Sequence, residues 1–317
     1  MGTSIDSIRA HDPFIVTDVE RGCYWWAADS LLRGREGRTS GGVDIRRSTD
    51  LKTFDDPLPA WRPPEDFFAQ WQYWAPEIYF HKGKWFMFTT TTGELKGSGI
   101  ITGAFPPEKI RGTMAFISDK PEGPYEPWSE GPLTPHTMLT LDGTLHIDRH
   151  GKPWMIYCHE WLQVIDGTIE ALPLSEDLKK AEGSPVHLFK SSDAQWSKGG
   201  YCESYGGVEY KKQIYVTDGP FLFYDLSGGL CMLWTTSSQG VYTTGIARSP
   251  NGEVAGPWEQ SPEPLYDKDG GHAMLFKTLE GTDMLAMHCP HTVKDSSERL
   301  KLIPVEYTQT GLKLLSS

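Results

Sequence analysis

Hydrophobic and polar positions along this chain alternate in short runs, as in β-strands. No stretch with the period of an amphipathic helix is long enough to predict a helix. Five segments share one pattern: a short apolar strand, a turn containing glycine, and a second apolar strand rich in aromatic and β-branched residues. They begin at Asp12, Ala75, Asp142, Asp218 and His272. Two such strands joined by a short turn are typical of a β-hairpin. A third strand-like run follows each hairpin, and these runs read GGVDIRRS, GTMAFISD, GTIEALPLS, TTGIARSPN and LKLIPVEYT.

The first strands of the five segments are spaced too irregularly for a stacked repeat protein. Their apolar centres are separated by 63, 67, 77 and 53 residues, whereas a solenoid keeps a constant period and a WD40 blade takes ~40–45 residues. The spacing fits four-stranded blades around an axis, joined by loops of different length. We therefore predict an all-β fold, a five-bladed β-propeller, as a single domain over residues 1–317. The segment LSEDLKKAEG, the best short helical candidate, is expected to be a turn.

The start of each first strand carries chemically useful residues. In a propeller the first strand of each blade lines the central axis. The N-terminal ends of these strands, which we call their mouths, therefore converge on one funnel-shaped cavity at the axis. Asp142 and Asp218, each followed by glycine, would alone be ordinary turn residues. Because both open first strands, we interpret them as equivalent positions of two blades that face one cavity. The five mouths carry Asp12, Trp74, Asp142, Asp218 and His272.

Charge and composition exclude several classes of protein. The formal net charge is −12, from 30 basic and 42 acidic residues, and no basic cluster is present, so we expect no nucleic-acid partner. No apolar run approaches the ~20 residues of a membrane helix, and the N-terminus lacks the pattern of a signal peptide. We therefore predict a cytoplasmic protein without a membrane partner, or a secreted one if a leader has been trimmed. The five scattered cysteines suit reduced thiols rather than a disulfide framework or a zinc site.

Six motifs in order along nearly the whole chain resemble glycoside hydrolase family 43. They read AHDPFIV, YWAPEIYFHKGKWFMF, LDGTLHIDRHGKPWMIY, TDGPFLFY, GGHAMLF and ERLKLIPVEY. The resemblance implies a five-bladed propeller that hydrolyses glycosidic bonds with inversion. It also implies an oligosaccharide substrate that contains arabinose, xylose or galactose.

The resemblance assigns roles to three carboxyl groups. Asp12 resembles the family's general base, and Asp142 resembles the aspartate that orients the general acid and raises its pKa. The general acid is normally a glutamate before Gly-Pro or Ala-Pro, whereas this chain has Asp218 before Gly-Pro. Aspartate is one methylene shorter, so its reach to the leaving oxygen changes. We prefer Asp218 because the Gly-Pro and the following strand are kept, and Glu203 is the alternative.

Other funnel residues have both a structural and a functional interpretation. Trp74 is either blade core or a wall on which sugar stacks, and we favour the wall. His272 is either a hydrogen-bonded core residue or, as the resemblance implies, a residue that helps hold a central water cluster or a structural calcium ion. Arg299 fits the family's sugar-binding arginine, because a guanidinium suits paired hydroxyls. Glu77 receives no catalytic role, and no cofactor is expected for the chemistry.

The sequence therefore predicts an inverting glycosidase that releases sugar from chain ends, as an α-L-arabinofuranosidase or a β-xylosidase, with no separate carbohydrate-binding module. Two alternatives stay open. The aspartate in place of glutamate is compatible with a sugar-binding propeller that has lost its activity, and the family also contains galactan-directed members. Nothing in the sequence predicts an oligomeric state.

Overall fold

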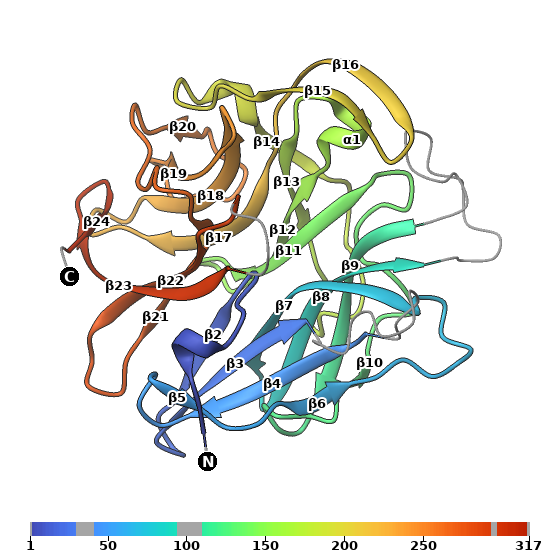
Figure 1. The fold of residues 1–317 in the computed structure, drawn as a ribbon, viewed down its shortest axis with the longest axis vertical. Coiled ribbons are helices and arrows are strands. Elements are labelled where there is room, and N and C mark those ends of the chain that lie inside the picture. Colours follow the sequence, from blue (N-terminus) through green and yellow to red (C-terminus); the bar gives the residue numbers. More distant parts are fainter. Residues whose placement is uncertain (1, 30–40, 94–109, 293–296, 316–317) are drawn as a thin grey trace.

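Five four-stranded antiparallel sheets surround a central axis (Figure 1). The computed structural model describes residues 2–29, 41–93, 110–292 and 297–315. Each sheet is built from strands that follow one another in the chain, except that β5, between β4 and β6, pairs with β1 outside the blade; the predicted five-bladed β-propeller is confirmed. The blades consist of β2 (Phe14–Asp18), β3 (Cys23–Asp29), β4 (Val43–Ser48) and β6 (Leu58–Trp61); β7 (Trp71–His81), β8 (Lys84–Gly93), β9 (Ile110–Ser118) and β10 (Glu126–Pro127); β11 (Thr140–Ile147), β12 (Pro153–His159), β13 (Thr168–Pro173) and β14 (Val186–Lys190); β17 (Asp218–Tyr224), β18 (Leu230–Ser238), β19 (Val241–Ser249) and β20 (Glu259–Gln260); and β21 (Gly271–Lys277), β22 (Asp283–Cys289), β23 (Arg299–Thr308) and β24 (Gly311–Leu314).

A few short elements lie outside the blades. The expected turn in LSEDLKKAEG is present, closed by a bridge between Leu174 and Ala181. Neither the short helix α1 (Trp161–Val164) nor the hairpin of β15 (Gly200–Tyr205) and β16 (Val208–Ile214) was predicted. The hairpin is inserted between blades three and four and accounts for the longest repeat spacing. The elements outside the blades are β1 (Thr3–Ser4), η1 (Ile5–Ser7), β5 (Thr53–Phe54), α1 (Trp161–Val164), η2 (Ser191–Asp193), β15 (Gly200–Tyr205) and β16 (Val208–Ile214).

The hydrophobic core lies between neighbouring blades. Apolar side chains of blades three and four meet in one such layer, where the rings of Phe189 and Trp234 are 5.4 Å apart. Blade one packs against blades two and five in a larger layer that includes Trp26 and Phe276. Each fully buried large apolar side chain contributes ~1.5–3 kcal/mol. Because this packing fixes the blades side by side, the mouths of their first strands are held at fixed positions around the axis.

Candidate active site

One residue at the mouth of each first strand has a positive φ angle. These residues are Asp12, Ala75, Asp142, Gly219 and His272, with φ of 46°, 44°, 54°, 50° and 51°. In blades two to five the strand register shifts at this residue. Side chains disfavour this conformation, aspartate less than most. Four non-glycine residues are thus held in a costly backbone state, which is a common property of functional sites.

This backbone pattern corrects one sequence prediction. Asp142 and Asp218 are not at equivalent positions, because the residue with positive φ in blade four is Gly219. Asp218 stands one residue earlier, at the position that Trp74 occupies in blade two. The Asp-Gly pair was misleading because both residues tolerate a positive φ. Glycine is also needed for close approach, since a Cβ at Gly219 would lie 2.7 Å from Cγ of His272.

Asp12 is surrounded by histidines. Its Oδ1 lies 3.0 Å from Nδ1 of His272 and 3.4 Å from Nδ1 of His288, and its Oδ2 lies 3.5 Å from Nε2 of His11. Burial alone would raise the pKa of Asp12, but the charges of His11 and His272 outweigh burial and hold this pKa well below its ordinary value. Asp12 is therefore an ionised proton acceptor at neutral pH.

His272 connects Asp12 to Asp142. Its Nδ1 lies 3.6 Å from Oδ2 of Asp142 as well as 3.0 Å from Asp12. Burial disfavours the charged ring, but the two carboxylates raise the pKa of His272 to about 10. Burial, only partly offset by the charge of His272, raises the pKa of Asp142 to about 6. At neutral pH the site therefore holds an imidazolium between two carboxylates.

Asp142 also touches the main chain beside Asp218. Its Oδ2 accepts the N–H of Gly219 at 3.0 Å, and its own N–H donates to Oγ1 of Thr90 at 2.8 Å. These bonds fix the peptide that follows Asp218 relative to Asp142. The structure thus brings Asp12, Asp142 and Asp218 together through His272 and one backbone amide.

Asp218 has the opposite electrostatic setting to Asp12. Burial, together with the negative charges of Asp142 and Asp12, raises the pKa of Asp218 to about 8. The hydroxyl of Tyr242 donates to its Oδ2 at 3.0 Å. Asp218 is therefore mostly protonated at neutral pH, next to two ionised aspartates. Two carboxyl groups with pKa values displaced in opposite directions are the mark of an acid and base pair.

Glu203, the alternative acid, lies elsewhere. It belongs to β15, where its side chain is exposed and lines a cleft beside the hairpin. No contact between Glu203 and the three aspartates is present in the described part of the chain. The geometry therefore favours Asp218.

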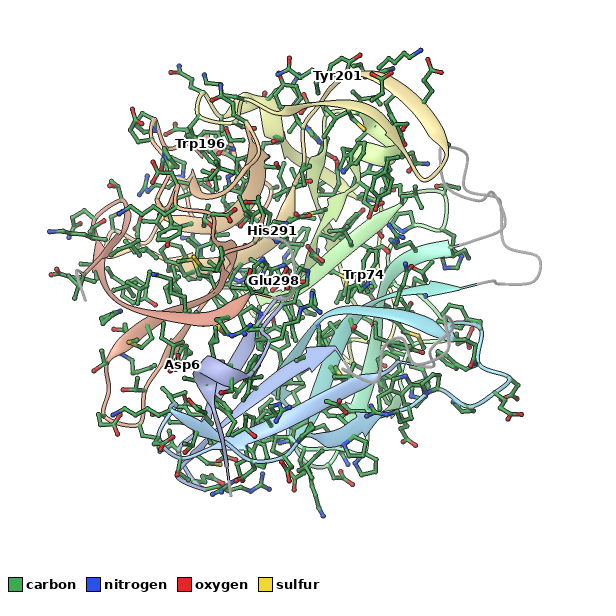
Figure 2. The ribbon with its side chains drawn as sticks, in the orientation of Figure 1. Asp6, Trp74, Trp196, Tyr201, His291 and Glu298 are labelled. Carbon is green, nitrogen blue, oxygen red and sulfur yellow. The ribbon has the colours of Figure 1, made fainter. Side chains whose placement is uncertain are left out.

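Trp74 is held by a buried ion pair. The guanidinium carbon of Arg111 lies 4.4 Å from the centre of the Trp74 ring. Arg111 Nη1 in turn donates to both carboxylate oxygens of Glu160, at 2.6 and 2.9 Å. The side chains of Arg111 and Glu160 are 2% and 5% exposed. One face of Trp74 is thus covered by a fixed cation, and Figure 2 places Trp74 near the centre of the ring.

This ion pair gives a stability prediction. Arg111→Met is expected to lower the free energy of unfolding by ~3–5 kcal/mol, because Glu160 would stay buried without a counter-charge. Urea unfolding measures this loss. The double variant Arg111→Met/Glu160→Leu is the control and should recover most of it, since an apolar pair leaves no buried charge. A free energy of unfolding for Arg111→Met within about 1 kcal/mol of that of wild type would contradict the role of the buried ion pair.

Two other residues that were singled out in the sequence have structural contacts. Arg299 donates from Nε to the carbonyl of Asp6 and from Nη1 to that of Glu298, both at 2.8 Å, and so ties β23 to η1. Its predicted contact with sugar stays a prediction. Glu77 is buried and bonded to the hydroxyl of Tyr79. Burial raises the pKa of Glu77 to about 8.

Sequence reasoning missed the histidines around Asp12. His11, His288 and His291 offer ring nitrogens within 4.8 Å of one another, which is a candidate metal-binding group. Nε2 of His288 lies 3.0 Å from Nδ1 of His291. Glu298 Oε1 lies 3.1 Å from Nδ1 of His11, and Figure 2 places His291 and Glu298 near the centre. The HCPH motif at residues 288–291 was visible in the sequence. Its position beside His11 was not, because only closure of the ring brings blade five next to the N-terminal segment.

Comparison with known proteins identifies the family. The sequence profile of Glycosyl hydrolases family 43 matches residues 3–312. The chain belongs to this family. The family 43 resemblance of the sequence motifs is therefore confirmed, and the chain is a glycosidase of an inverting family.

Several family 43 relatives are similar over most of their length. An endo-arabinase from Bacteroides thetaiotaomicron VPI-5482 is 35% identical, with a TM-score of 0.80 over 97% of this chain and 98% of that one. The extracellular exo-alpha-(1->5)-L-arabinofuranosidase ArbA of Cellvibrio japonicus (strain Ueda107) is 21% identical over 75% of this chain and 68% of its own. An alpha-L-arabinofuranosidase from Lactobacillus brevis shares the fold, with 19% identity, a TM-score of 0.72 and coverage of 95% and 91%.

The donor set around His272 bears on the calcium ion that family 43 implies. Ca²⁺ takes six to eight oxygen ligands, whereas Nδ1 of His272 is bonded to Asp12 and faces Asp142. The described protein groups therefore fit only an ion that keeps most of its own water.

In the described residues, no helix is long and apolar enough to cross a membrane.

Proposed function

We propose that this family 43 member hydrolyses arabinose-containing oligosaccharides with inversion, with Asp12 as general base and Asp218 as general acid. The opposite displacement of their pKa values carries the proposal. Ionised Asp12 takes a proton from water as its oxygen attacks the anomeric carbon. Protonated Asp218 gives its proton to the glycosidic oxygen as the bond from that oxygen to the anomeric carbon breaks. Water thus supplies the new hydroxyl of one product, and the acid supplies the proton of the other.

Asp142 acts as a positioning residue in this scheme. Its negative charge contributes to the raised pKa of Asp218, and its bond to the N–H of Gly219 holds the acid's backbone in place. His272 keeps Asp12 and Asp142 ionised at a distance that would otherwise cause strong repulsion. Trp74 and Arg299 are the proposed substrate contacts, by ring stacking and by donation to hydroxyls.

Arabinose is proposed as the sugar because of the relatives. The 35% identical relative is named an endo-arabinase, and the curated relative is named for exo action on an α-(1→5)-linked arabinofuranoside. We keep the prediction that sugar is released from a chain end, with the β-xylosidase and galactan-directed activities as alternatives. The cytoplasmic location stays a prediction, and the curated relative is named extracellular.

Product analysis tests this function. Linear arabino-, xylo- and galacto-oligosaccharides are incubated with the protein, and early products are separated by chromatography. We expect hydrolysis of the arabino-oligosaccharides with arabinose as the first small product. From a hexasaccharide, early products of two, three or four sugars in place of arabinose and a five-sugar remainder would contradict release of single sugars from a chain end. Faster hydrolysis of xylo- or galacto-oligosaccharides would contradict the choice of sugar, and sugar binding without any turnover would favour the inactive propeller.

Removal of metal gives a further prediction. The proposed chemistry uses aspartates and water, so EDTA is expected to leave kcat nearly unchanged at a temperature where the fold persists. A calcium ion at the propeller centre is proposed only as a structural element, whose loss would lower the melting temperature. Full loss of activity in EDTA with the fold intact would contradict the prediction.

A further inference from the structure

The hairpin β15–β16 borders a cleft that the proposed chemistry does not use. The two strands form their own sheet between blades three and four and are paired with none of the blades. A cleft of about 760 Å³ lies beside them, lined by the hairpin, by α1 and by the turn between β18 and β19. This volume is within the ~300–1,000 Å³ range of small-molecule sites.

Aromatic rings dominate one side of this cleft. Tyr201 and Tyr205 line it with 68% and 51% of their surface exposed, which is unusual for large apolar groups. Trp161, the first residue of α1, packs against the hairpin, with its ring 5.5 Å from that of Tyr205 and 5.2 Å from that of Tyr210. The hydroxyl of Tyr210 donates to the carbonyl of Leu162 at 3.0 Å and fixes the hairpin to α1. The rings therefore form a supported platform.

The remaining lining is polar and suits hydroxyl groups. Side chains that donate and accept hydrogen bonds border the rings, namely Glu203, Ser204, Gln213, Ser237 and Gln239. A sugar ring has an apolar face that packs on an aromatic ring and a rim of hydroxyls that needs such partners. The combination of exposed tyrosines with amides, hydroxyls and a carboxylate therefore matches a carbohydrate chain.

The cleft does not include Asp218 in its lining but reaches residues two positions from Asp218 and from its strand partner. Val216 lines it and stands two residues before Asp218, a span of at most ~7 Å along an extended chain. Ser237 lines it too, two residues after Thr235, the partner of Asp218 in β18. Figure 2 shows Tyr201 at the outer rim, on the side of the ring where β15 lies. The cleft thus runs outward from the end of blade four that carries Asp218.

We propose that this cleft binds the sugar units on the leaving-group side of the bond being cleaved. The inference rests on the proposed function, because a general acid protonates the leaving oxygen and the leaving part of the substrate must therefore lie on its side. Sugars beyond that oxygen would stack on Tyr201, Tyr205 and Trp161. The cleft then makes the enzyme respond to the length of its oligosaccharide.

The double variant Tyr201→Ala/Tyr205→Ala tests the platform. We expect kcat/KM for arabinohexaose to fall about tenfold, the usual worth of one or two aromatic contacts. Hydrolysis of an aryl arabinofuranoside, whose leaving group is too short to reach the hairpin, should be unchanged. Phe80→Ala is the matched control, since Phe80 is 62% exposed at the far end of β7 from Trp74 and lies outside the cleft. Equal losses on both substrates, or no loss on either, would overturn the proposal.

A binding measurement separates failure of the platform from failure of the proposed function. Migration of the wild type through a gel containing debranched arabinan should be retarded, and the double variant should be retarded much less. If the wild type hydrolyses no arabinoside but shows this difference, the proposed activity is wrong and the platform stands. If both proteins migrate alike, the cleft does not bind arabinan, whatever the activity.

Discussion

Asp12→Asn is expected to lower kcat by ~10²–10⁴ while leaving KM within a few-fold of wild type. The base acts on water rather than on the sugar, so its loss should affect the chemical step more than substrate binding. The asparagine keeps an oxygen that can accept from His272 but cannot take a proton from water. Steady-state kinetics on arabino-oligosaccharides measures both constants.

Asp6→Asn is the matched control for this variant. Asp6 is an exposed acid in η1, six residues earlier in the chain, and has no contact with the three aspartates among those described. We expect it to keep wild-type kinetics. Should Asp12→Asn keep kcat within a few-fold of wild type, Asp12 is not the base.

Asp218→Asn is expected to slow natural oligosaccharides by ~10²–10⁴, yet hardly affect a dinitrophenyl arabinofuranoside. A sugar alkoxide is a poor leaving group and needs a proton as it departs, whereas a dinitrophenolate departs without one. The ratio of the two kcat values, measured at saturating substrate where weaker sugar binding no longer counts, therefore reports the acid. A variant that merely disturbed the site would slow both substrates together.

Glu203→Gln is the control for the general acid. Glu203 lies in the exposed hairpin rather than beside Asp12, so Glu203→Gln can raise KM for long oligosaccharides through the cleft but should leave kcat near wild type on both kinds of substrate. If Glu203→Gln instead lowers kcat on natural oligosaccharides by ~10²–10⁴ and spares the dinitrophenyl substrate, the assignment to Asp218 is wrong.

The blades were predictable because their signal is local. Each first strand, turn and second strand lies within about 20 residues, and its hydrophobic pattern is set by burial between blades. The hairpin β15–β16 was missed for the opposite reason. All residues of β15 are exposed or half-buried, so the strand carries no alternation between a buried and an exposed face.

The site was predictable only in part. Asp12, Asp142 and His272 lie at the mouths because the strand pattern marks where each strand begins. The offset of Asp218 by one residue was hidden, since aspartate and glycine both accept a positive φ. Tyr242 reaches Asp218 from β19, two strands away in the same blade, and Glu298 reaches His11, the neighbour of Asp12, only because blade five closes on blade one.

Asp218 must carry a proton to act as the general acid, which predicts a basic limb in the pH profile. Asp218 acts while protonated and loses its proton as pH rises through about 8, so kcat/KM of wild type should fall there. His272 has a pKa of about 10 and cannot produce this limb. Glu77 also has a pKa of about 8, so Glu77→Gln is the necessary control and should keep the limb.

The most direct test is therefore the pH dependence of kcat/KM on one and the same arabino-oligosaccharide for wild type, for Asp218→Asn and for Glu77→Gln. We expect wild type to lose activity around pH 8 and Asp218→Asn to show no loss there. A basic limb that persists unchanged in Asp218→Asn, or disappears in Glu77→Gln, would contradict the assignment of Asp218 as the general acid.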